Sequence, residues 1–196
     1  MTNRGFRCLL IAGAAAALGV TLAWPTEPTE ASAATIDVKA TTAQASFIKR
    51  SAAAAAVNRT AYGVPPSVTI AQAILESNWG QSPLAKNENN YFGMKCSDNV
   101  PGPIAKGCAT YPTKECDASG CYDTPALFRS YWSVADSFRD HDKKLFEASR
   151  YDPAFNYPHD ADQFIREVHK AGYATDPNYS EKVIKLMRDF DLYRFN

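Results

Sequence analysis

The sequence has no excess of charge of either sign, since 21 Lys and Arg residues stand against 21 Asp and Glu residues among 196. Proteins that capture nucleic acid or an anionic membrane surface by electrostatics usually carry a basic surplus. We therefore expect neither nucleic acid nor a membrane surface as a partner. The chain also has no internal repeat, and its length fits one domain that is large enough to bury its own core.

Histidine is scarce. The three histidines are His141, His159 and His169, and they lack the spacing of metal ligands. We therefore expect no metal site and no cofactor. His141 falls on the apolar face of a predicted helix, and the other two are expected at the surface.

Long apolar runs are missing as well. The stretch Leu9–Ala23 is shorter than the roughly 20 residues that a membrane-spanning helix needs. It follows the basic residues Arg4 and Arg7 and precedes the small residues Ala31-Ser32-Ala33. This order predicts a secretory signal peptide over residues 1–33, cleaved after an Ala-x-Ala site. We expect a secreted protein, extracellular or in the cell wall, with no membrane attachment after cleavage.

Paired Cys-x-x-Cys motifs, typical of structural zinc sites, are absent. Beyond the signal peptide the chain keeps four cysteines, and an even number in an exported protein predicts disulfides. Three pairings are possible. We favour Cys96–Cys108 and Cys116–Cys121, because each closes a short loop. Thiols held in disulfides also leave no nucleophilic cysteine.

The remaining pattern divides the chain into a short flexible lead, residues 34–45, and a folded domain, residues 46–196. Helices are expected at both ends of the domain, over about 46–62 and 64–78 and again from Ser133, Asp160 and Asp176. Between them, the short runs 109–111 and 126–131 predict a pair of strands. The outline is an α+β fold, mostly helical, with a small disulfide-pinned β-hairpin lobe and a cleft between the lobes.

Glu76 is the first candidate for chemistry. It lies near the end of an otherwise apolar predicted helix. The partial negative charge of a helix C-terminus and apolar neighbours both disfavour an ionised carboxylate, so its pKa is expected to be raised. A carboxyl with a raised pKa is suited to general acid catalysis near neutral pH. A solvated glutamate at a fraying helix end remains the alternative.

Four segments, in the same order, resemble the motifs of glycoside hydrolase family 73, the bacterial endo-β-N-acetylglucosaminidases. They are Ala71–Ser82, Asn89–Lys95, Phe128–Tyr131 and Ala171–Tyr179. The resemblance extends from about Phe47 to Phe190, almost the whole predicted domain. The pair Glu76-Ser77 alone is shared with lysozymes and lytic transglycosylases. The match is specific because all four segments occur together in this order.

The resemblance implies a lysozyme-like fold with Glu76 as the acid that protonates the leaving oxygen. It also implies a second acidic residue in the β lobe. Counting back from Phe128–Tyr131 gives Glu115, with Asp123 as the alternative, and a mechanism without an essential second carboxylate stays open. The resemblance further implies that Tyr173 is a site residue near the acid.

Other residues of the matching segments are candidates for binding sugar. Trp79, Tyr91 and Phe92 carry rings that stack on pyranose faces, and Asn90 offers an amide for hydrogen bonds. Packing in the core is the alternative for Trp79 and for Tyr173.

The resemblance implies hydrolysis of β-1,4 bonds in peptidoglycan glycan strands, or in a related glycan that contains N-acetylglucosamine. We expect a monomer that needs no cofactor. A lytic transglycosylase or a lysozyme-type muramidase is the alternative, followed by a non-catalytic module that binds cell wall or chitin.

Overall fold

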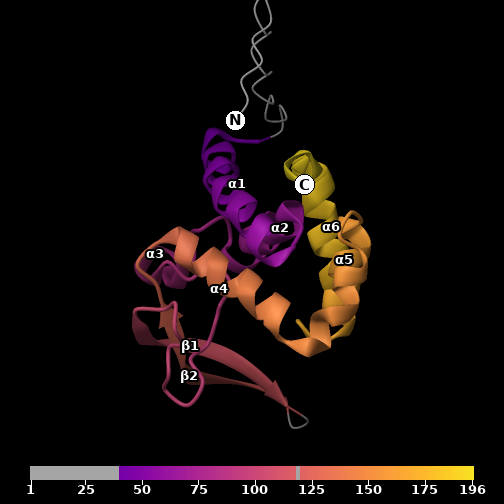
Figure 1. Ribbon diagram of the computed structural model, residues 1–196. Coiled ribbons are helices and arrows are strands. Elements are labelled where there is room, and N and C mark those ends of the chain that lie inside the picture. Colours follow the sequence, from indigo (N-terminus) through magenta and orange to yellow (C-terminus); the bar gives the residue numbers. More distant parts are fainter. Residues whose placement is uncertain (1–39, 118–119) are drawn as a thin grey trace, which may run out of the picture. The chain divides into compact units, whose positions relative to one another are not determined.

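The computed structural model describes residues 40–117 and 120–196, without the side chains of Glu115, Cys116, Asp117 and Cys121 (Figure 1). The predicted signal peptide, residues 1–33, lies outside the described residues, as does the lead up to residue 39. Among the described helices, none has the length and apolar character needed to cross a membrane.

The first helix, α1 (Thr42–Tyr62), begins before the expected start at Ser46. Its start is a capping box: the Thr41 hydroxyl accepts from the Gln44 backbone N–H, and the Gln44 side chain accepts from the Thr41 N–H. The last residues expected in the flexible lead are therefore helical. The helix ends at Gly63, as predicted, in the left-handed conformation (φ 74°) that glycine adopts without strain.

The second helix, α2 (Pro66–Ser77), is the central element of the fold. It carries proline in its first turn and ends at Asn78, as predicted. It packs against α1 and against α6 and η2 near the C-terminus. Because it has neighbours on several sides, almost all of its side chains are buried, and Glu76 is an exception.

A short helix that the sequence did not predict, α3 (Pro83–Glu88), leads to the β lobe. The lobe is one antiparallel hairpin of β1 (Gly107–Asp117) and β2 (Gly120–Ser130), and both strands are longer than the predicted runs. The predicted disulfide Cys96–Cys108 is confirmed and ties the preceding loop to the start of β1. The register places residues 116 and 121 opposite each other. Their side chains lie outside the description, so the second disulfide stays a prediction.

The C-terminal half is helical: α4 (Val134–Glu147), the 3₁₀ segment η1 (Ser149–Asn156), α5 (Ala161–Lys170), α6 (Tyr179–Asp189) and η2 (Leu192–Phe195). The predicted caps at Ser133 and Asp160 are confirmed, since each side chain accepts from the backbone N–H three residues later. The last helix begins at Tyr179 rather than at Asp176, whose side chain accepts instead from the Asn178 N–H in a turn before the helix.

One hydrophobic core joins α1, α2, α4, α5 and α6, and Phe138, Leu145 and Phe164 are fully buried in it. Figure 1 shows these helices gathered on one side of the hairpin. The α+β class, mostly helical with a small hairpin lobe, is confirmed.

The disulfide Cys96–Cys108 generates a stability prediction. It closes a loop with a sequence separation of 12, and a loop of that size stabilises by roughly 2–3 kcal/mol, chiefly by restricting the unfolded chain. The double variant Cys96→Ser and Cys108→Ser should lose about that much unfolding free energy in urea titration. Equal stability of variant and wild type contradicts the prediction. Mass spectrometry of the oxidised wild type should also show residues 116 and 121 joined.

Candidate functional site

Glu76 lies near the end of α2, where its side chain is exposed along a groove. The Tyr179 hydroxyl donates to Glu76 Oε1 at 2.9 Å, and it accepts from Gln72 Nε2 at 2.9 Å. Gln72 is one helical turn before Glu76, whereas Tyr179 is the first residue of α6. Two helices that are far apart in sequence thus hold one oxygen of the carboxyl in place.

The pKa of Glu76 is raised above its ordinary value. The main cause is loss of hydration: although the residue reaches solvent, its carboxyl is crowded by the neighbouring side chains. The hydrogen bond from Tyr179 and the charge of His141 act in the opposite direction but are smaller. Glu76 therefore keeps its proton to a higher pH than a solvated glutamate, as predicted from its place on the helix.

Tyr179 remains protonated in this site. Burial, with the nearby Tyr173 and Glu76 adding to it, raises the pKa of Tyr179 far above its ordinary value. Burial also raises the pKa of Tyr173 well above normal. Both residues therefore keep a hydroxyl proton that can be donated, and neither is a candidate base at neutral pH.

Tyr173 is held from its other side by a buried polar chain. Its hydroxyl shares a hydrogen bond of 3.0 Å with His141 Nε2, and His141 Nδ1 lies 2.9 Å from Asp142 Oδ1. The carboxylate of Asp142 also accepts from Thr69 Oγ1 at 2.9 Å and Asn58 Nδ2 at 2.8 Å. His141 and Asp142 are fully buried, and buried polar atoms need hydrogen-bond partners. Both ring nitrogens of His141 and both carboxylate oxygens of Asp142 have one.

Aromatic rings complete the packing around the chain. Phe92 stacks on His141 with centroids 3.9 Å apart and planes 15° apart. The rings of Tyr173 and Tyr179 lie 5.4 Å apart. Phe92 is therefore buried next to the site, and Tyr173, which the resemblance implied as a site residue, lines the same groove as Glu76.

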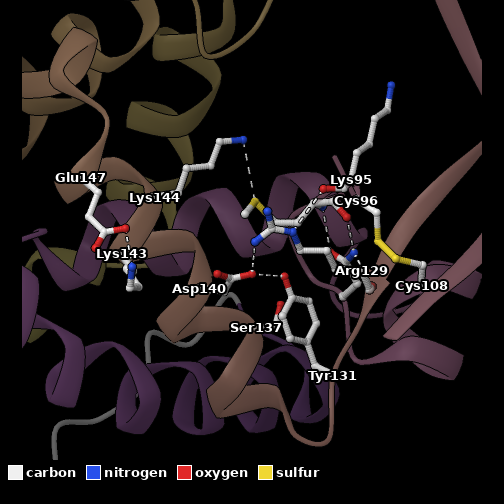
Figure 2. Close-up of polar contacts among 12 residues, drawn as sticks. Lys95, Cys96, Cys108, Arg129, Tyr131, Ser137, Asp140, Lys143, Lys144 and Glu147 are labelled. Carbon is white, nitrogen blue, oxygen red and sulfur yellow. Dashed lines mark hydrogen bonds and ion pairs between the residues drawn. A yellow bond between two sulfur atoms is a disulfide. The ribbon is translucent and has the colours of Figure 1, made fainter. Parts of the chain in front are cut away.

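The groove consists of three hollows. Glu76 and Tyr173 line one of about 440 Å³, toward Asp176 and Lys182, and also a second of about 210 Å³, toward Phe92 and Lys144. The second shares Gly93 and Lys144 with a third of about 540 Å³, which reaches Arg129 and the start of the hairpin. Figure 2 shows polar contacts of several residues that line this third hollow, among them Arg129, Asp140 and Lys144. Glu76 thus lines two neighbouring hollows, and the third adjoins the second.

The second predicted carboxylate is placed only by its backbone. Glu115 lies on β1 opposite Tyr122, and the alternative Asp123 lies opposite Lys114 on the neighbouring strand. The side chain of Glu115 is outside the description, and that of Asp123 is exposed. In the hollows that Glu76 lines, the other described carboxylate is Asp176, and hydrogen bonds from Lys182 and from the Asn178 N–H lower its pKa.

The remaining sugar-binding candidates are spread over the domain. Asn90 is buried: its amide nitrogen donates to the carbonyl oxygens of Met94 and Arg129, and its oxygen accepts from the Met94 N–H. Trp79 packs edge-on against Phe190 with centroids 4.7 Å apart, and it lines a separate hollow near the start of α1.

Tyr91 packs against Phe47 and Phe138. Of the four candidates, Phe92 is the one that lines a hollow with Glu76. Within residues 40–117 and 120–196 there is no group of three or more potential ligands that could hold a metal.

Tyr179, the hydrogen-bond partner of Glu76, was not predicted from the sequence. Tyr179 belongs to the last of the four quoted motifs, but it is 103 positions away from Glu76, and no local pattern connects them. Asp142 was missed as well. A carboxylate next to a histidine on the apolar face of a predicted helix was the available signal, because a charge there needs partners.

The chain is similar to known proteins over most of its described length. A family model described as mannosyl-glycoprotein endo-beta-N-acetylglucosaminidase matches residues 52–192. The peptidoglycan hydrolase FlgJ of Vibrio parahaemolyticus is 37% identical over 134 residues, covering 67% of this chain and 42% of the relative. The exo-glucosaminidase LytG of Bacillus subtilis is 35% identical over 143 residues, covering 69% and 47%. The chain therefore spans less than half the length of either relative.

Among solved structures, the catalytic domain of the autolysin Auto from Listeria monocytogenes has a TM-score of 0.69 and 32% identity, over 82% of this chain and 91% of that one. The glycoside hydrolase domain of FlgJ from Salmonella typhimurium has a TM-score of 0.60 and 30% identity, over 77% and 90%. The likeness therefore extends over nearly the whole of both solved domains.

The hydrogen bond between Tyr179 and Glu76 generates a prediction about pH. This bond lowers the pKa of Glu76, so Tyr179→Phe should raise that pKa further. If the protonated carboxyl is the active form, the alkaline limb of the rate profile should move to higher pH. Tyr193→Phe is the matched control, because the Tyr193 hydroxyl donates to Asp162, which lines none of the three hollows. If the alkaline limb does not move in Tyr179→Phe, the group that titrates in that limb is not Glu76.

Proposed function

The chain belongs to the glucosaminidases of glycoside hydrolase family 73, and on this premise we propose that it hydrolyses β-1,4 bonds in peptidoglycan glycan strands, on the reducing side of N-acetylglucosamine. The observation that carries the proposal is Glu76, a carboxyl of raised pKa that lines two neighbouring hollows. General acids need this combination, because they must hold a proton near neutral pH within reach of the bond that breaks.

In the proposed reaction Glu76 donates its proton to the glycosidic oxygen while Tyr179 holds the other side of the carboxyl in position. Two routes supply the nucleophile. In an inverting route Glu115 activates a water on the opposite face of the sugar, which requires carboxyl groups about 6.5–9.5 Å apart. In a substrate-assisted route the acetamido group of the sugar attacks first, and the Tyr173 hydroxyl or Glu115 orients it. Neither route needs a metal or a cofactor.

We propose cleavage within strands rather than removal of terminal sugars. Glu76 lines two neighbouring hollows and a third adjoins the second, which leaves room for sugars beyond the bond that breaks. LytG, a relative named as an exo-glucosaminidase, makes the other outcome a specific alternative.

We also propose that the protein is exported and acts as a monomer outside the cytoplasmic membrane, where peptidoglycan lies. The segment 1–33 has the order of a signal peptide, and the disulfide Cys96–Cys108 fits an oxidising compartment.

Mass analysis of digested sacculi tests the proposed bond. New reducing ends on N-acetylglucosamine within fragments of several sugars support the endo-glucosaminidase. Anhydro ends indicate a lytic transglycosylase, reducing N-acetylmuramic acid ends a muramidase, and single released sugars an exo-enzyme. An unchanged glycan leaves a binding module.

The first prediction of the mechanism is that Glu76→Gln folds and binds glycan but loses about 10²- to 10⁴-fold in turnover, the usual contribution of a general acid. Stability should not fall. Because the pKa of Glu76 is raised in the folded state, its ionisation destabilises the fold as pH rises above the ordinary value of 4.5. The amide cannot ionise, so at neutral pH the variant should melt at the same temperature as wild type or higher. Wild-type turnover in a folded variant ends this proposal for Glu76.

The second prediction separates the two routes. If Glu115 is the base, Glu115→Gln should lose activity almost as fully as Glu76→Gln, and azide should partly restore turnover by giving a glycosyl azide of inverted configuration. In the substrate-assisted route the loss should be mild, and a thiazoline analogue of N-acetylglucosamine should inhibit. The control is Asp123→Asn. An inactive Asp123→Asn with a fully active Glu115→Gln shows that the hairpin position was counted wrongly.

A further inference from the structure

The part of the groove next to Glu76 is rich in cations, and we propose that Lys144, together with Arg150 and Arg129, binds a carboxylate carried by the peptidoglycan strand. The inference rests on the proposed function, because it assumes that a glycan strand lies across Glu76. It adds a charge requirement to that substrate, which the catalytic carboxyl alone does not explain.

The three cations come from three separate elements that meet at the groove. Lys144 lies on α4, Arg150 on η1 and Arg129 on β2. Lys144 lines both the hollow that contains Glu76 and the wider hollow that follows it. Arg150 lines the first and Arg129 the second. A strand that continues from Glu76 toward the hairpin therefore passes Lys144.

The carboxylates of the wider hollow already have partners (Figure 2). Asp140 Oδ2 lies 2.6 Å from Arg129 Nη1 and accepts from the Tyr131 hydroxyl at 2.7 Å. Glu147 pairs with Lys143 one helical turn earlier. Each of these two carboxylates thus has its own cation as ion-pair partner, and neither forms an ion pair with Lys144.

Lys144 has no carboxylate in ion-pair contact among the described residues. Its Nζ lies 4.0 Å from Met94 Sδ, and a thioether is a weak acceptor. Although Lys144 reaches solvent, loss of hydration in the groove is the first cause that lowers its pKa, and the charges of Arg150 and Arg129 follow. Arg150 and Arg129 each lower this pKa by more than Asp140 raises it, so the positive charges outweigh Asp140 at this point. An anion next to Lys144 would be attracted by Lys144 and Arg150, and by the part of the Arg129 charge that Asp140 does not balance.

Arg150 is held in place for this role. Its guanidinium lies 4.6 Å from the centroid of the Tyr151 ring and donates from Nη2 to the Tyr151 hydroxyl at 2.6 Å. Arg129 is fixed likewise, because its Nε donates to the Lys95 carbonyl oxygen at 3.1 Å. Two of the three cations are therefore held in position before a ligand binds, which lowers the ordering cost of binding.

The chemistry of the strand suggests what this site binds. Chitin and peptidoglycan share the N-acetylglucosamine unit, but chitin is neutral. Peptidoglycan carries carboxylates, either on the lactyl ether of muramic acid or on the stem peptide attached to it. A cationic site beside the bond that breaks therefore selects the acidic sugar as neighbour. A charged hydrogen bond of this kind corresponds to about a tenfold difference in affinity or more.

Binding to the inactive variant Glu76→Gln tests the site without turnover. Calorimetry at low salt would compare a chitin oligosaccharide with a peptidoglycan strand of equal length whose stem peptides have been removed. The acidic strand should bind about tenfold more tightly. Adding Lys144→Met should remove this difference and leave chitin binding unchanged, whereas Lys144→Arg should keep it. Lys185→Met is the control, because Lys185 lines none of the three hollows and pairs with Asp189.

A third ligand, the same strand with its stem peptides, identifies the carboxylate. Preference for the stem-free strand identifies the lactyl carboxylate as the ligand. Preference only for the strand with peptides identifies a carboxylate of the stem. Either result supports a carboxylate site. Equal affinity for acidic and neutral strands, or no binding of any acidic strand, overturns it. If the acidic preference holds but wild type releases no reducing ends from sacculi, the proposed reaction fails while the binding site stands.

Discussion

The burial of α2 is the constraint on which the rest of the structure depends. A helix surrounded by α1, α6 and η2 has no free side on which to place a charge, and Glu76 escapes burial only where the helix ends at the groove. One of these neighbours, α6, crowds the carboxyl and supplies the Tyr179 hydroxyl that fixes its direction. The position of the Glu76 carboxyl and its raised pKa thus both follow from the packing of α2.

Asp142 illustrates how the fold tolerates charge in its interior. Its two oxygens accept from α1, through Asn58, and from α2, through Thr69, and they contact His141 on its own helix. A buried carboxylate costs several kcal/mol without such partners. With them it joins three helices at one point, and through His141 it fixes the Tyr173 hydroxyl at the groove. The site is therefore supported from the core and not from the surface loops.

The sequence predicted what local physics determines. Gly63 predicted where the first helix ends, and the proline pair before Ser67 predicted where the second begins. The Cys96–Cys108 pairing was predicted from the short loop that it closes. The place of Glu76 on an apolar helix was enough to predict the direction of its pKa shift. The resemblance to a family added Tyr173, which no local pattern indicates.

Contacts between distant segments were not accessible from the sequence. The bond between Tyr179 and Glu76 joins residues 103 positions apart. Asn90 has the same amide whether it binds a sugar or the carbonyl oxygens of Met94 and Arg129, and only the loop geometry distinguishes these uses. The length of the strands depended on pairing across the hairpin, which short hydrophobic runs do not determine.

The hairpin is held to the helical body at one end. The described contacts that attach it lie in the half near its base and include the disulfide at Cys108, the bonds of Glu88 with Ser130 and Tyr111, and the burial of Phe128. A two-stranded ribbon is marginally stable without such packing, so its far part is held by the pairing of its own strands. The distance between the helix that carries the acid and residue 115 is therefore set by the base of the hairpin and by strand pairing, and not by packing along its length.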